Sequence, residues 1–125
     1  MLRIILIVLA VFVLAGVFFM FNGLGYIKNM NVSEVDLSTV PDGTYSGSFR
    51  RGRWVYNVEV TVRDHKIHSI SLGEGMGTMA GEINDKIIAE ILAQQSPKID
   101  AVSGATVTTK ALAKAVENAL ESGSR

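Results

Sequence analysis

Residues 100–112, with the sequence DAVSGATVTTKAL, combine hydroxyl groups with very small residues. Gly104 and Ala105 stand directly before an alanine-rich pattern that is typical of a helix. The N-terminus of a helix presents unpaired backbone N–H groups and favours a phosphate without help from lysine or arginine. A hydroxyl at the same place can also simply cap the helix. The pattern leaves both interpretations open for its four alcohols, Ser103, Thr106, Thr108 and Thr109.

The composition limits which chemistry this stretch can support. The 125 residues contain no cysteine, which excludes disulfides, thiolate metal sites and protein-ligated iron–sulfur clusters. His65 and His68 flank an expected turn and are interpreted as surface residues, so no metal site is predicted. Twelve basic residues are interspersed with twelve acidic ones, and we therefore expect no nucleic-acid partner. Redox chemistry in this chain would have to come from a bound organic cofactor.

The N-terminus is an unbroken apolar run of 18 residues, from Ile4 to Phe21. As a helix it would extend about 27 Å, close to the thickness of a bilayer core. A cleaved signal peptide is the alternative, but the run is long for one and no small-x-small cleavage site follows it. The flanking charges weakly favour a cytoplasmic N-terminus. We therefore predict a single-pass anchor in the cell membrane at residues 1–22, a tether at 23–41, and a folded domain at 42–125 on the extracytoplasmic side.

The folded domain begins with three predicted strands. In the second strand, every even position from 54 to 62 is apolar, whereas the odd positions after Val55 are polar. Residues 42–49 alternate in the same way and form the first strand. A tight turn at residues 64–65 leads to the third strand, 66–72, whose predicted inward residues are Ile70 and Leu72. Connections this short predict an antiparallel meander.

Two helices are predicted after the strands. Residues 81–94 place isoleucine and leucine at the spacings of an amphipathic helix. Residues 107–121 carry a narrower apolar stripe of small side chains, which suits close packing. The predicted fold class is therefore α+β: a small antiparallel sheet, wound as a meander and packed with two helices, preceded by one N-terminal transmembrane helix.

Residues 100–106, Asp-Ala-Val-Ser-Gly-Ala-Thr, resemble the flavinylation motif of the FMN-binding domain family. This module occurs in the covalent-flavin subunits of sodium-translocating quinone reductases and related electron-transfer complexes. The resemblance extends over about residues 41–120, through PDGTYSGSF, KIHSISL, GEGMG and AVENAL in the family's order. It implies that a magnesium-dependent flavin transferase takes FMN from FAD, joins its phosphate to the Thr106 hydroxyl as a phosphoester, and releases AMP. The other residues of the implied loop are Asp100, Ser103, Gly104 and Ala105.

The flavin ring would also need a surface to lie on, and the glycine-rich stretch 73–81 is the candidate. Gly75 and Gly77 would let a flat ring approach the backbone, and Met76 could pack against it. A flexible loop, with Met79 in the core, is the alternative interpretation. The same glycines match a dinucleotide fingerprint superficially, but three antiparallel strands precede them and the domain is too short for the remaining parallel sheet.

These inferences predict an extracytoplasmic, membrane-anchored flavoprotein that relays electrons between redox partner proteins through covalent FMN. No catalytic residue is predicted, and the chain is expected to be a carrier and a substrate of the transferase rather than a stand-alone enzyme. Two alternatives stay open. One is a noncovalent FMN-binding adaptor or sensor, and the other is a small extracytoplasmic flavin reductase.

Overall fold

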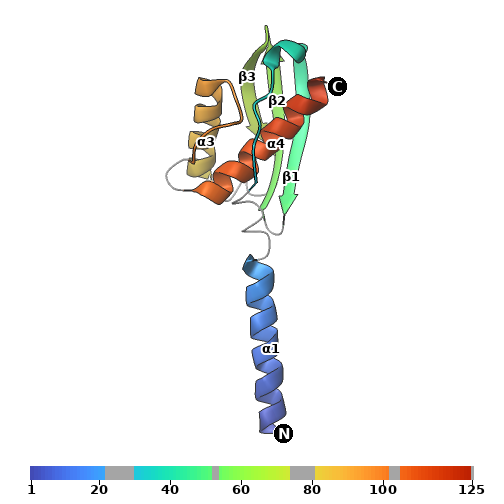
Figure 1. Ribbon diagram of the computed structural model, residues 1–125, viewed down its shortest axis with the longest axis vertical. Helices are drawn as coiled ribbons and strands as arrows, with labels where there is room; N and C mark the ends of the chain where they lie inside the picture. The colour runs from blue at the N-terminus through green and yellow to red at the C-terminus, as the bar shows by residue number, and fades with distance from the viewer. Residues whose placement is uncertain (22–29, 52–53, 74–80, 102–104, 125) are drawn as a thin grey trace.

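The computed structural model describes residues 1–21 (side chains to residue 18), 30–51, 54–73, 81–101 and 105–124. Helix α1, Leu2–Phe21, stands apart from the rest of the chain (Figure 1). Its described side chains are exposed on every side, and Phe12 is 75% exposed. Over the described residues, no helix has both the length and the hydropathy needed to cross a membrane.

The sheet is a three-stranded antiparallel meander in the order β1-β2-β3, as the sequence predicts. Its strands are β1 (Gly43–Arg51), β2 (Trp54–Arg63) and β3 (Lys66–Leu72). The even residues of β2 are buried and form the middle of the core, which confirms the predicted alternation. Between β2 and β3 the chain turns at Asp64 and His65, both with positive φ, as a tight two-residue hairpin requires.

A bulge in β3 changes which of its residues face inward. Thr61 pairs with Ser69, but Val62 pairs with Ile67, so His68 has no partner across the ladder. The extra residue turns Ile67 into the core, where it is buried. The sequence pattern predicts only Ile70 and Leu72 as inward residues, and both are half-buried against the core.

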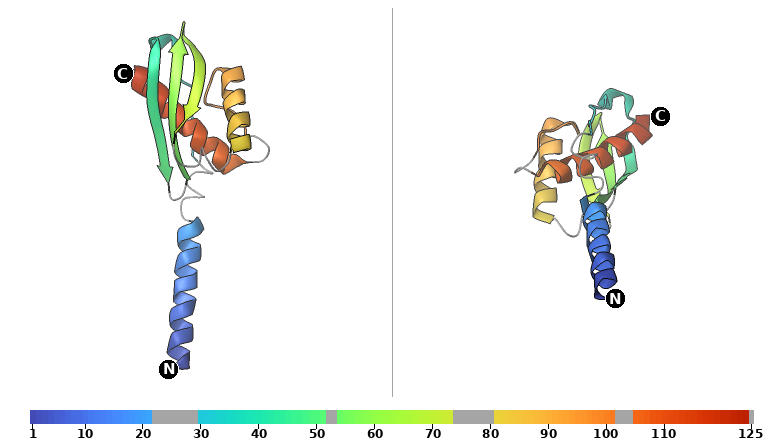
Figure 2. Two further views of the ribbon diagram at one scale, coloured as in Figure 1. Left: turned by 180° about the vertical axis from the view of Figure 1, so that it is seen from behind. Right: turned by 60° about the horizontal axis from the view of Figure 1, so that its bottom comes forward.

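Helices α3 (Gly81–Gln94) and α4 (Thr106–Ser124) complete the α+β fold. Both lie on one side of the sheet, and the view from behind shows the three strands uncovered on the other side (Figure 2). The helix expected at 107–121 begins one residue earlier and ends three residues later. Its small residues allow close packing, because a Cβ atom at Gly47 of β1 would meet the backbone of Ala115 and Ala119.

Residues 30–41 lie along α4 as an extended segment that includes the short 3-10 helix η1, Leu37–Thr39. The N–H of Ser33 donates to Glu117 Oε1 at 3.2 Å, and Val40 is completely buried. The sequence assigns these residues to a tether at 23–41, so the second half of that tether packs on the domain. As a result α4 is covered by the sheet on one side and by residues 30–41 on another.

Candidate functional site

Thr106 is the first residue of α4, and it is half-buried. The backbone N–H of Thr109 donates to the carbonyl oxygen of Ala105 at 2.9 Å. This bond closes the first turn of the helix, so the N–H groups of residues 106–108 precede the helical hydrogen-bond ladder. A phosphate attached to Thr106 would lie at the positive end of the helix dipole. The local geometry therefore fits a phosphoester on this hydroxyl.

The four alcohols of the motif differ in their surroundings. Thr109 is only 1% exposed, and its hydroxyl lies in the interior. Thr106 and Thr108 are both half-buried. Ser103 lies outside the described residues, as does Gly104. Burial therefore argues against Thr109 as an attachment point and leaves Thr106, at the helix start, as the residue best placed for one.

A cleft of about 340 Å³ opens beside the first two turns of α4. It is formed by α4, by the loop before it, and by the segment that begins at residue 30. Asp100 is exposed and lines this cleft, together with Thr109 and Lys110. Thr106 lies on the same face of α4, since residues three, four and seven positions apart share one face of a helix. The full lining is Met30, Asn31, Val32, Glu34, Lys98, Ile99, Asp100, Thr109, Lys110 and Ala113.

Sequence reasoning missed this cleft. The spacing of Thr106, Thr109, Lys110 and Ala113 could have indicated the α4 wall, because the four residues follow a helical repeat. The opposite wall at residues 30–34 shows no periodicity, and its position depends on contacts with residues about eighty positions later, such as Ser33 with Glu117. No local pattern signals that wall.

The predicted ring-binding residues Gly75, Met76 and Gly77 lie outside the described residues. The chain leaves β3 through Gly73, whose N–H donates to the carbonyl oxygen of Asn57 at 2.7 Å, and it returns at Gly81, where α3 begins. The first turns of α3 and α4 lie side by side in both figures (Figures 1 and 2). The predicted ring surface is therefore attached at the end of the domain that carries Thr106.

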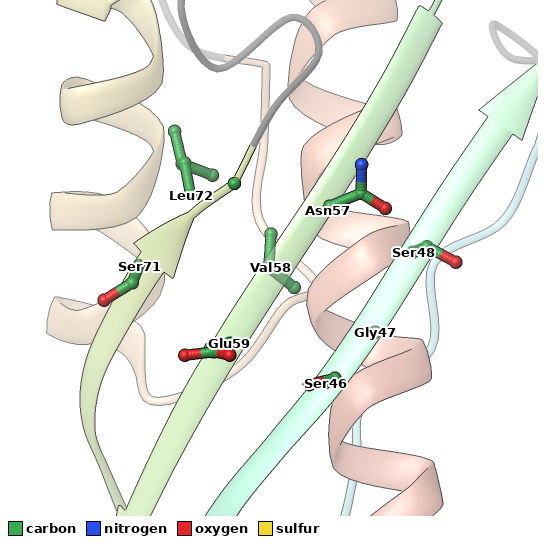
Figure 3. Close-up of a pocket in the computed structure, with 9 residues that line it drawn as sticks. Ser46, Gly47, Ser48, Asn57, Val58, Glu59, Ser71 and Leu72 are labelled. Carbon is green, nitrogen blue, oxygen red and sulfur yellow. The ribbon is translucent and has the colours of Figure 1, made fainter.

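A larger hollow, of about 580 Å³, lies on the uncovered face of the sheet (Figure 3). It is lined by small polar side chains on all three strands, with α4 behind them. Glu59 stands in the middle row, between its cross-strand neighbours Ser46 and Ser71. No residue of the 100–106 motif contributes to this lining, whereas Asp100 lines the cleft beside α4. We therefore place the candidate site at α4 and not in the larger hollow.

Two buried polar groups hold the elements around the site in place. Glu117, 2% exposed, pairs with Lys114 at 2.6 Å through Oε2 and accepts the Ser33 N–H through Oε1. The Tyr56 hydroxyl donates to Asn84 Oδ1 at 2.7 Å and links β2 to α3. Burial raises the pKa of Tyr56 to about 12, and the hydrogen bond to Asn84 opposes that rise. Within the described residues, no cluster of three or more potential metal ligands is found.

A comparison with known families identifies one that this chain matches. The model of a family described as the FMN-binding domain matches residues 55–121, which is more than half of the chain. The match extends from β2 into α4 and includes the whole 100–106 motif. No curated protein matches the chain significantly.

Proposed function

The chain belongs to the FMN-binding domain family, and from that premise we propose that it carries FMN through a phosphoester on the Thr106 hydroxyl and relays electrons at a membrane surface. The observation that carries the proposal is the position of Thr106. This residue ends the 100–106 motif, begins α4, and keeps its side chain partly accessible beside a cleft.

The attachment step is a phosphoryl transfer that a separate flavin transferase would catalyse, with FAD as the donor. The Thr106 oxygen forms a bond to the phosphorus of the FMN half of FAD, and the pyrophosphate P–O bond breaks, so that AMP leaves. The hydroxyl proton passes to a base of the transferase, whose magnesium ion stabilises the charge on the phosphates. This chain contributes a partly accessible alcohol at the start of α4, where the small residue Ala105 precedes it directly.

Once FMN is attached, the first turn of α4 stabilises the remaining negative charge of the phosphodiester through its backbone N–H groups. The cleft beside it offers apolar contacts from Val32 and Ile99, and its charged lining residues are two lysines, Lys98 and Lys110, and two carboxylates, Glu34 and Asp100. FMN supplies the ability to accept and release one or two electrons. A covalent link keeps the cofactor in place outside the cell, where no pool of free FMN would replace it.

We also propose that α1 anchors the chain in the cell membrane, with the folded domain on the extracytoplasmic side. Apolar side chains are exposed on all sides of its described part, and they need apolar surroundings to be stable. The anchor would hold the flavin close to redox partner proteins of a membrane electron-transfer chain.

The proposed attachment can be tested by producing the chain together with a flavin transferase. We expect a band with flavin fluorescence on a denaturing gel, and an intact mass increased by one FMN less water. The variant Thr106→Val should lose both signals, whereas Thr106→Ser should keep them because it retains a hydroxyl. Thr108→Val is the matched control, since Thr108 is also half-buried in the first turn of α4.

Three outcomes would contradict this proposal. Fluorescence that survives in Thr106→Val and disappears in Thr108→Val would move the attachment to the second hydroxyl. An unmodified mass, with FMN bound but released on denaturation, would instead support the noncovalent adaptor or sensor. Turnover of an external acceptor in the presence of a reduced donor would support the flavin reductase.

A further inference from the structure

We propose that the end of the domain that carries Thr106 docks on an anionic lipid surface through Arg50 and Arg51, at the end of β1. This proposal rests on the proposed anchoring by α1. The docking specifies how the anchored domain is oriented, because a tethered domain could otherwise turn any of its faces toward the bilayer.

The path of residues 30–42 defines which end of the domain is connected to α1. Met30 lines the same cleft as Thr109, in the first turn of α4. Ser33 bonds to Glu117 two turns later, and Asp42 accepts the N–H of Asp64 at the far end of the sheet. The segment therefore runs parallel to α4, and the chain enters the domain at the N-terminal end of that helix.

The connection to α1 is short. Nine peptide units separate Phe21, the last residue of α1, from Met30, and they can span at most about 30 Å even when fully extended. The end of the domain with Thr106 is therefore held within about 30 Å of the end of α1. Figure 1 shows that end of the domain toward α1.

The arginines lie at that same end because β1 and α4 run in opposite directions. Gly123, near the end of α4, packs against Tyr45, near the start of β1. The end of β1, with Arg50 and Arg51, therefore lies toward the start of α4, as Figure 1 also shows.

The charge at this corner suits an anionic surface. Arg50 and Arg51 are both exposed, and a third arginine, Arg53, follows in the sequence. Across the ladder, Arg50 pairs with Val55 and Arg51 pairs with Trp54. An arginine near anionic headgroups shifts the docking equilibrium by about fivefold, which corresponds to about 1 kcal/mol. The short connection adds to this effect by keeping the local concentration of lipid high.

Acidic residues also lie at this end of the domain. Glu82 and Asp85 lie in the first turns of α3, on the other side of α4 from β1 (Figure 1), and the exposed Glu34 and Asp100 line the cleft beside α4. The domain should therefore tilt, with the corner between β1 and β2 toward the lipid and the first turns of α3 away from it. In this orientation the start of α4, which carries Thr106, would face the headgroup region.

The single tryptophan provides a direct readout, because Trp54 begins β2 and pairs with Arg51. We would place the full chain, made without the transferase so that no flavin quenches the signal, in bilayer discs that contain a lipid with a spin-labelled headgroup. The discs are phosphatidylcholine alone or phosphatidylcholine with phosphatidylglycerol. Flotation with vesicles of the same composition, measured first, reports on the anchor independently of the orientation.

We expect stronger quenching of Trp54 fluorescence in the anionic discs, and loss of the difference at about 1 M salt, where the screening length is about 3 Å. The double variant Arg50→Gln/Arg51→Gln should weaken docking by roughly 25-fold. The control is Arg63→Gln, which replaces an exposed arginine at the opposite end of β2. Its Trp54 fluorescence should be quenched as strongly as that of the parent chain.

Each alternative result overturns a defined part of the proposal. Equal quenching in both kinds of disc would overturn the orientation, and so would a loss of quenching in Arg63→Gln as large as that in the double variant. The anchor and the flavin attachment would stand in either case. A chain that does not float with vesicles would overturn the anchor together with the docking. The salt dependence of Trp54 quenching in the parent chain still tests the proposal if the double variant folds poorly.

Discussion

Gly47 permits a contact between β1 and α4 that no other residue would allow. An added Cβ atom would lie 2.7 Å from Ala119 Cα, closer than real Cβ contacts come, so the helix or the strand would have to move. We predict that Gly47→Ala lowers the free energy of unfolding by about 1–3 kcal/mol through overpacking. Urea denaturation would measure the change. The control is Gly81→Ala, because a Cβ atom there has nothing within 4 Å. Equal stability of the two variants would contradict the close contact.

Tyr56 should make the stability of the domain depend on alkaline pH. The side chain is fully buried, and its pKa is raised to about 12, whereas an unfolded chain has a tyrosine pKa of about 10. Between these values the unfolded state loses the proton and the folded state keeps it. The contribution of Tyr56 is therefore complete below about pH 10 and is lost as the pH rises toward 12, by about 1.4 kcal/mol per pH unit.

The measurement is urea denaturation of the parent chain and of Tyr56→Phe over this pH range. The variant lacks the ionisable group, so the steep loss should be absent from it. At neutral pH it should be less stable by about 1–3 kcal/mol, because the buried Asn84 Oδ1 loses the tyrosine donor. The same alkaline slope in both chains would show that Tyr56 is not the cause.

At the scale of elements, Gln95 joins α3 to the outer edge of β3. Its side-chain amide accepts the Ile67 N–H at 2.7 Å and donates to the Ile67 carbonyl at 3.0 Å, so it pairs with the strand as a neighbouring backbone would. We predict that Gln95→Ala lowers the free energy of unfolding by about 1–3 kcal/mol. Gln94→Ala, an exposed neighbour, should change it by less than about 0.5 kcal/mol. Hydrogen exchange at the Ile67 amide would show directly whether the edge opens.

The elements with a strict repeat could be predicted from the sequence, and those fixed by long-range contacts could not. The alternation from Trp54 to Val62 predicts β2 because one face of that strand is buried along its whole length. The bulge at His68 could not be predicted from a local sequence pattern, because it depends on the pairing of Val62 with Ile67. Thr106 was predicted through its motif and family resemblance, but the cleft beside it was not, because residues 30–34 reach it from a distant part of the sequence.

At the scale of the whole molecule, the candidate site and the connection to α1 lie at the same end of the domain. The start of α4, the ends of the loop between β3 and α3, and the point where the chain joins the domain from α1 all lie there. The opposite end holds the turn at residues 64–65 and the C-terminus of α4. With α1 as the proposed anchor, a flavin on Thr106 would therefore stay near the membrane.

The packing of residues 30–41 on α4 predicts where a stable domain must begin. A chain that starts at Met30 keeps Val40, which is completely buried, and the bond from Ser33 to Glu117. A chain that starts at Asp42, the boundary expected from the sequence, loses both and uncovers one side of α4. We predict that it is less stable than the longer chain by at least about 2 kcal/mol, because burying one valine contributes about 1.5–3 kcal/mol.

Urea denaturation of the two shortened chains would measure this difference, with Val40→Ala in the longer chain as the matched variant. That substitution should cost about half of the effect or more, since it removes the buried side chain but keeps the Ser33 bond. If both shortened chains unfold at the same urea concentration, residues 30–41 add nothing to the domain. The wall that they form beside Thr106 would then be absent in solution, and the cleft would not be available to support a bound flavin.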